Sequence, residues 1–279
     1  MKVTYLGTTV LLFDDGKDQI LFDAHLSRPK LLTVPFVALQ TDEEICDEIL
    51  RNHIINRLKA IFISHTHHDH VLDMPYIANH TGADVYGSRS CVNVGRGGNV
   101  EEEKLHEFEV HTPITIGDFQ ITIIPSLHSK PNMFNNDLGQ TIDEPLVQPA
   151  KMKCFKEGGS YDFIVKHKET TYVIRPSFNY IEGQLDGIKA DVLFLGIGGL
   201  SKADDEMKEK FFEETIEKVQ PALVLPLHWD NFFSDLRKPV KGMPSLMENT
   251  NASLFELTKY CEAHNISFVV QLPRTHMYI

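Results

Sequence analysis

Short apolar segments separated by polar turns recur along the whole chain. Residues 3–12 and 19–22 are rich in β-branched and aromatic side chains and flank the turn Asp14-Asp15-Gly16, which predicts a β-hairpin. A second hairpin is expected where residues 161–166 and 171–174 flank a polar turn. The other segments with strand character are 60–63, 84–86, 108–111, 114–116, 119–124, 191–195, 222–227 and 267–272.

Four segments space their apolar residues at helical intervals instead, namely 41–58, 73–80, 204–219 and 253–264. In the third of these the apolar stripe consists of Met207, Phe211, Phe212, Ile216 and Val219. Two groups of strands with helices outside them predict an α+β fold, a four-layer αββα sandwich of two mixed β-sheets flanked by helices.

One segment has little periodicity. Residues 129–160 are rich in Asn, Gly, Pro, Asp and Lys, which predicts a long loop rather than a separate domain. Loops of this length often carry function, so we expect this one to lie beside the active site of a single domain that spans residues 1–279.

The balance of charge limits the classes of partner. The chain has 39 acidic and 27 basic residues, a net charge of -12. Attraction to nucleic acid or to a membrane surface requires a basic face, so neither partner is expected, although a local basic pocket for a small anion is compatible with this balance. No secretory signal or membrane span is evident, so we expect a cytoplasmic protein that acts on a small molecule. The sequence is compatible with a monomer and with a homo-oligomer.

The run His65-Thr66-His67-His68-Asp69-His70 directly follows an apolar strand segment. Zinc requires three or four nitrogen, oxygen or sulfur ligands held close together, and alternate side chains of a tight loop supply several of them. The alternative is a polar loop that is rich in histidine by chance. The four cysteines form no C-x-x-C pair, and we interpret them as reduced thiols.

Two later histidines strengthen the metal interpretation. His128 and His228 each follow an apolar strand that ends in a proline-containing segment. Separate strands therefore deliver both side chains to one place, and we expect them to be metal ligands. The remaining histidines, including His25, lack this context and are interpreted as surface or packing residues.

These motifs resemble the metallo-β-lactamase superfamily, which combines an H-x-H-x-D-H run after a strand with two later histidines. The resemblance covers essentially the whole chain and is nearest to the branch of the lactamase B 2 type that includes L-ascorbate-6-phosphate lactonase-like and phosphodiesterase-like proteins. It implies the sandwich fold and one or two zinc ions, with manganese or iron as alternatives. A first metal would be held by His65, His67 and His128 and a second by Asp69, His70 and His228.

Two further residues follow from this resemblance. Asp23, after the segment Ile20-Leu21-Phe22, matches an early acidic residue of the family, and its implied role is to orient a ligand histidine. Ser177 stands where the family carries a bridging aspartate, and no Asp or Glu occurs between Glu169 and Glu182. A serine hydroxyl is a poor zinc ligand, so we predict one firmly held metal and a second site of lower occupancy.

The chemistry expected from such a site is hydrolysis. A metal held by three neutral imidazoles with an open position lowers the pKa of its bound water to roughly 7, which makes a metal-bound hydroxide available as the nucleophile. Asp69 is the candidate catalytic residue, because it would orient that hydroxide or carry its proton to the leaving group. An ester, a lactone or a phosphodiester is the expected substrate. Trp229, Asp230, Asn231 and Phe232, together with Asn179 and Tyr180, either line the substrate pocket or pack in the core.

The competing interpretation is a non-catalytic descendant of the fold, which binds a metal or ligand without turnover because Ser177 replaces a ligand. An oxidoreductase of the flavodiiron type is disfavoured, since a carboxylate would be expected where His67 stands. RNA processing is disfavoured by the acidic balance of the chain.

Overall fold

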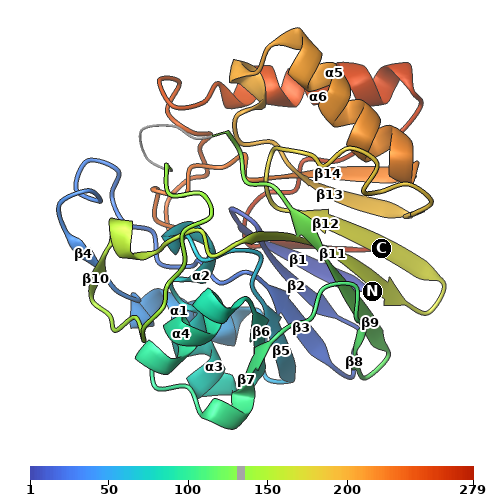
Figure 1. Cartoon of the computed structure of the whole chain (residues 1–279). Helices are drawn as coiled ribbons and strands as arrows, with labels where there is room; N and C mark the ends of the chain where they lie inside the picture. The colour runs from blue at the N-terminus through green and yellow to red at the C-terminus, as the bar shows by residue number, and fades with distance from the viewer. Residues whose placement is uncertain (131–135) are drawn as a thin grey trace.

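Two seven-stranded sheets form the centre of the protein in a computed structural model that describes residues 1–130 and 136–279 (Figure 1). The first sheet has the order β16 (Thr275–Tyr278), β1 (Lys2–Gly7), β2 (Val10–Asp14), β3 (Gln19–Phe22), β5 (Leu58–Phe62), β6 (Asp84–Gly87) and β7 (Leu105–Glu107). The second has the order β15 (Ser267–Phe268), β14 (Leu223–Leu227), β13 (Val192–Gly196), β12 (Thr170–Arg175), β11 (Ser160–His167), β9 (Phe119–Ser126) and β8 (Ile114–Ile116). A small pair, β4 (Ala38–Leu39) and β10 (Ala150–Lys151), lies apart from them.

Both sheets are mixed and follow the same plan. In the first sheet β1, β2 and β3 pair antiparallel, whereas β3, β5, β6 and β7 run parallel. In the second sheet β8, β9, β11 and β12 pair antiparallel, whereas β12, β13, β14 and β15 run parallel. Parallel strands place their carboxyl ends at the same edge, so residues that follow several of these strands meet in space.

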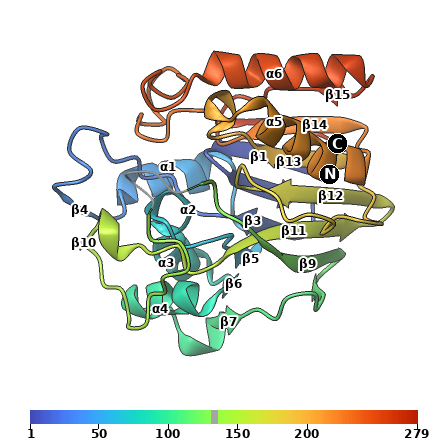
Figure 2. The same cartoon turned by 45° about the horizontal axis from the view of Figure 1, so that its top comes forward.

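Helices cover the outer faces of the two sheets, as Figures 1 and 2 show. On the first sheet lie α1 (Glu43–Asn52), α3 (Met74–Thr81) and α4 (Arg89–Gly97), with the short α2 (His68–Val71) at the sheet's edge. On the second lie α5 (Asp205–Phe212), the π-helical turn η4 (Glu213–Glu217) and α6 (Thr250–Ala263). Three 3-10 turns complete the described elements: η1 (Glu102–Lys104), η2 (Met152–Cys154) and η3 (Leu200–Lys202). The four-layer sandwich predicted from the sequence is confirmed.

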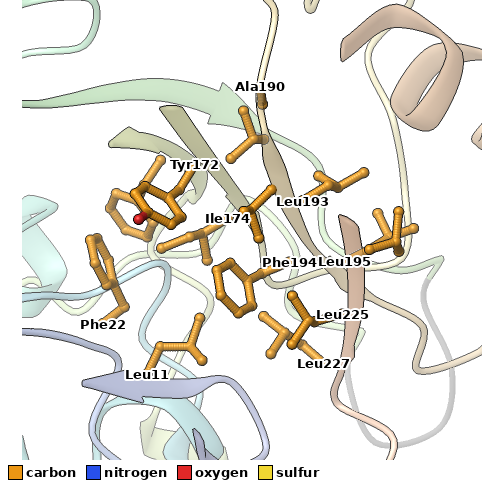
Figure 3. Packing of buried hydrophobic residues seen from close by; sticks show 14 of the residues in the cluster. Leu11, Phe22, Tyr172, Ile174, Ala190, Leu193, Phe194, Leu195, Leu225 and Leu227 are labelled. Carbon is orange, nitrogen blue, oxygen red and sulfur yellow. The ribbon is translucent and has the colours of Figure 1, made fainter. Parts of the chain in front are cut away.

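The core between the sheets is built from aromatic and branched side chains that interdigitate (Figure 3). Phe13 of the first sheet meets Tyr172 and Phe194 of the second edge to face, with ring centroids 5.2 and 5.8 Å apart. Phe22 reaches Phe163 with centroids 5.1 Å apart. Such pairs add to the stability that the buried area provides and fix the two sheets against each other.

Several boundaries differ from the prediction. The segment 41–58 is not one helix: α1 ends at Asn52, and Ile54 has a φ of 53°, which a right-handed helix does not allow. The strand expected at 108–111 is wrong, because β7 ends at Glu107 and His111 turns the chain with a φ of 64°. Residues 267–272 were expected to form one strand, but the strand β15 ends at Phe268 in the second sheet. The chain then passes to the first sheet, where β16 pairs with β1.

Helix α4 was not predicted, because two of its residues are glycines that weaken a helical pattern. Tertiary contact explains one of them. A Cβ on Gly97 would lie 2.0 Å from the carbonyl oxygen of Leu146, so the 139–150 segment packs against bare backbone here. Across the residues that the structure describes, no helix combines the length and apolar character needed to cross a lipid bilayer.

Candidate metal centre

Histidines and carboxylates gather where strands of both sheets end. Asp23 follows β3, the His65 run follows β5, His128 follows β9 and His228 follows β14. The chain thus brings side chains from positions far apart in the sequence to one edge of the sandwich. All six histidine and aspartate side chains that the sequence analysis named as metal ligands lie in two clusters here.

The first cluster consists of His65, His67 and His128, whose candidate ligand atoms lie within 4.8 Å of one another. The Nδ1 atom of His67 and the Nε2 atom of His128 are 3.2 Å apart. Among the described residues, nothing forms a hydrogen bond with the buried Nε2 atom of His65. Buried polar atoms are normally satisfied, so an orphaned nitrogen beside two others fits a bound cation.

The second cluster consists of Asp69, His70 and His228, again with ligand atoms within 4.8 Å. Asp69 Oδ2 lies 3.4 Å from His228 Nε2 and 3.8 Å from His70 Nε2. The two clusters are in contact, because the rings of His65 and His70 lie 3.7 Å apart. No described residue belongs to both clusters.

Burial sets the protonation of this edge. Burial, reinforced by neighbouring imidazoles, lowers the pKa of His65 well below its usual value and that of His128 to about 3. Burial would raise the pKa of Asp69, but the electrostatic interaction with His70 and a hydrogen bond from His228 outweigh it and hold the pKa well below normal. Near neutral pH the His65 and His128 imidazoles are therefore uncharged and Asp69 is ionised. Neutral imidazoles and a carboxylate are the states that bind metals.

The histidine run was expected on a loop, and only its first half is one. Residues from His68 onward form the helical turn α2, for which His67 is the N-cap. The residues before His68 form a loop that a distant segment holds in place, since the backbone amide of Thr66 donates to the carbonyl oxygen of Glu157 at 2.8 Å. Asp69 and His70 thus project from a helical turn, and the change of backbone conformation after His67 separates them from His65 and His67.

Asp23 lies under the second cluster and accepts several hydrogen bonds. Its Oδ2 atom is 2.7 Å from His70 Nδ1 and accepts from the Thr9 hydroxyl at 2.6 Å, while its Oδ1 atom accepts from the amide of Ser64 at 2.8 Å. Such a carboxylate fixes the ring so that the other nitrogen, Nε2, faces the cluster. Asp23 has a φ of 54° and His228 one of 58°, a strained conformation that concentrates at functional sites.

Asp137, in the predicted loop 129–160, is a site residue that was not predicted from the sequence. Its Oδ1 atom is 3.2 Å from His67 Nε2, so it orients the ring with Nδ1 toward His128. Residues 131–135 of that loop lie outside the described residues. No local pattern marks Asp137, since only the path of the loop brings it to His67.

The other candidates are divided between site and core. Trp229 is buried, and Asp230 is buried as well but borders a hollow together with Asn231, whereas the Phe232 ring packs against His228 with centroids 5.1 Å apart. Asn179 supports the first cluster by donating from Nδ2 to the carbonyl oxygen of His128 at 2.7 Å. Ser177 is buried two residues beyond β12. His25, expected at the surface or in packing, is buried with its ring edge to face with His68 at 6.0 Å.

Replacing Asp137 with asparagine is expected to weaken metal binding at the first cluster by about tenfold, because the carboxylate no longer fixes the His67 ring. Competition with a chromophoric chelator measures this affinity. Asp143→Asn is the matched control, since Asp143 lies in the same segment, is exposed and bonds only to Thr141 among the described side chains. Equal affinity in both variants would show that Asp137 does not orient the ring.

A sandwich of two mixed sheets with paired histidine and aspartate clusters at the strand ends defines the metallo-β-lactamase fold. Residues 18–229 match the beta-lactamase superfamily domain family, and the chain belongs to that family. The resemblance inferred from the His65 run is thereby confirmed at the level of the superfamily.

Relatives and solved structures agree with this placement. A UPF0173 metal-dependent hydrolase of Carboxydothermus hydrogenoformans is 25% identical over 232 residues, 83% of this chain and 86% of the relative. Igni18, a metallo hydrolase from Ignicoccus hospitalis, is 16% identical with a TM-score of 0.61, covering 100% of this chain and 98% of that one. Zinc-bound PqqB of Methylobacterium extorquens is 10% identical with a TM-score of 0.58, covering 100% of both chains. At identities this low, the similarity of the structures establishes a shared fold and nothing more.

Proposed function

We propose that this protein is a metal-dependent hydrolase that acts on an ester, lactone or phosphodiester of a small molecule. The observation that carries the proposal is the first cluster, where the pKa values of His65 and His128 are lowered and the buried Nε2 atom of His65 has no hydrogen-bond partner among the described residues. An ionised carboxylate, Asp69, belongs to the second cluster in contact with it. The name of the Carboxydothermus relative, a metal-dependent hydrolase, supports the same activity.

Zinc is the proposed metal, with manganese or iron as alternatives, because nitrogen-rich sites suit all three. His65, His67 and His128 would hold the first ion. A divalent ion held by these residues would supply Lewis acidity and would lower the pKa of a water molecule to about 7.

The protein's own residues supply the remaining steps. Asp69, held ionised beside His228, accepts a proton from the attacking water and passes it to the leaving group. Asp23 and Asp137 fix the orientation of His70 and His67. The Phe232 ring shields His228 from solvent on one side.

Turnover of a substrate panel tests the function. The panel contains a p-nitrophenyl ester, an aliphatic lactone and bis(p-nitrophenyl) phosphate, each assayed with zinc, manganese or iron and with a chelator. We expect turnover of at least one class that chelation abolishes and metal restores. A metal-loaded, folded protein that is inert on all classes would favour the non-catalytic descendant instead.

The two clusters are proposed to differ in metal affinity. The first offers three imidazole nitrogens, and among the described residues no carboxylate belongs to both clusters. Position 177, where the resemblance places a bridging aspartate, is serine. Two divalent ions carry four positive charges, and without a bridging aspartate one more of those charges is left uncompensated. Metal analysis at graded free zinc should therefore show one tight and one weak ion.

Ser177→Asp is expected to strengthen the weaker site at least about tenfold, because a carboxylate adds negative charge beside both ions. Ser177→Asn is the control, since it adds similar bulk without charge. Two equally tight ions in the unaltered protein, or equal affinities in the two variants, would contradict this account of position 177.

A further inference from the structure

A basic pocket lies beside the candidate metal centre and is not part of it. The pocket has a volume of about 240 Å³ and lies between the segment that follows β3 and the loop that follows β14. Its walls carry four cationic side chains and one carboxylate: Arg28, Lys30, Lys238, Lys241 and Asp235. The chain as a whole has a net charge of -12, whereas the residues around this pocket carry a net positive charge.

None of the three lysines forms a contact ion pair among the described residues. Asp235 is paired with Arg237, whose Nη2 atom lies 3.0 Å from the carboxylate. Arg28 is paired with Asp230 at 2.8 Å, and both side chains are buried. Within the described part of the chain, no carboxylate lies within the 4.0 Å pairing distance of Lys30, Lys238 or Lys241. Three lysines that line one hollow give it a positive potential, which attracts an anion.

The buried Arg28 holds the pocket's two walls together. Its Nη1 atom donates to the carbonyl oxygen of Asn231 at 3.1 Å, which ties the segment after β3 to the loop after β14. Its partner Asp230 accepts from the Tyr5 hydroxyl at 2.5 Å and from the Thr8 amide at 2.8 Å. The Nε and Nη2 atoms of Arg28 are buried and have no hydrogen-bond partner among the described residues.

The loop that carries two of the lysines is closed at its base. The amide of Asn231 donates to the carbonyl oxygen of Lys241 at 2.8 Å, and Asp230 and Gly242 form an antiparallel bridge. Lys238 and Lys241 are therefore set on a braced loop, which lowers the entropy lost when a ligand binds.

The pocket shares a wall with the metal centre. Phe233 lines the pocket, and its ring lies 6.4 Å from that of His68 and 4.3 Å from that of Phe232. Phe232 in turn packs against His228. The rings of Phe233 and Phe232 thus connect the wall of the pocket to His228 of the second cluster.

We propose that this pocket binds the anionic group of the substrate, a phosphate or a carboxylate, and so selects anionic substrates for the neighbouring metal centre. The selection rests on the hydrolase function proposed above, whereas binding of the anion does not. Phosphate is expected to bind more tightly than acetate, because its greater charge is matched by three ammonium groups.

Calorimetric titration of the metal-loaded full chain with inorganic phosphate tests the binding. The double variant Lys238→Met with Lys241→Met removes two charges and keeps the length of the side chains. The control is Lys59→Met with Lys166→Met, two exposed lysines on strands away from the pocket. We expect the phosphate Kd to rise at least about tenfold in the pocket variant and to stay within about twofold in the control. Phosphate bound only at the metals would leave all three forms equal, and that result, like no binding at all, overturns the proposal.

Kinetics separate this proposal from the proposed function. Matched esters with and without a phosphate group are compared, and the pocket variant should raise KM for the phosphorylated ester alone while kcat is unchanged. An unchanged KM for both esters overturns the selection of anionic substrates. If the unaltered protein hydrolyses nothing, the proposed function fails, and calorimetry still decides whether the pocket binds an anion.

Discussion

Alanine at position 65 is expected to remove the tightly held metal and to lower kcat/KM by about 10³-fold or more. His65 is fully surrounded by protein, and its Nε2 atom is the orphaned nitrogen of the first cluster. Without it two imidazoles remain, fewer than the three protein ligands that zinc keeps in catalytic sites. The pKa of the attacking water then returns from about 7 toward that of bulk water, which removes the nucleophile at neutral pH. Metal content and steady-state kinetics on a substrate that the panel identifies measure both effects.

His167→Ala separates the loss of a ligand from the loss of a buried histidine. His167 is also buried, but it pairs with Asp15 at 3.2 Å near the opposite ends of the strands. This variant should lower the melting temperature and keep both metal and activity. If His65→Ala were folded, fully loaded with metal and fully active, the assignment of the first cluster would be wrong.

Asparagine at position 69 is expected to lower kcat by about 10² to 10⁴-fold while the first metal stays bound. The substitution keeps the size of the side chain and removes its charge. Asp69 is the ionised carboxylate of the second cluster, and the amide that replaces it accepts no proton from water. Measurement of kcat together with zinc content distinguishes a catalytic loss from a loss of metal.

Asp15→Asn serves as the matched control for this change. Its side chain is buried like that of Asp69, and it lies in the β2–β3 turn at the other end of the molecule. Activity should be unchanged, whatever the effect on stability. An Asp69→Asn protein that retained both its metal and full activity would exclude Asp69 from proton transfer.

Helices and strands were predicted correctly from the sequence wherever interactions between residues close together in the chain determine the structure. The helix expected at 253–264 matches α6 (Thr250–Ala263), whose N-cap Asn249 accepts a hydrogen bond from the amide of Ala252 at 3.2 Å. The paired segments 161–166 and 171–174 correspond to β11 and β12. Prediction failed at α4, where a packing contact with Leu146 tolerates only glycine, and at the final strand, whose continuation β16 pairs with the N-terminal β1.

The sequence by itself determined the fold class and the candidate ligands, because a six-residue run and two histidines after apolar strands are local signals. Tertiary structure decided how those side chains are held. Asp137 comes to His67 from a loop about seventy residues away, and Arg28 meets Asn231 across 203 positions of the chain. Such contacts depend on loop paths and on the docking of two sheets, which no local pattern encodes. The basic pocket beside the His65 to His70 run exists only after that docking.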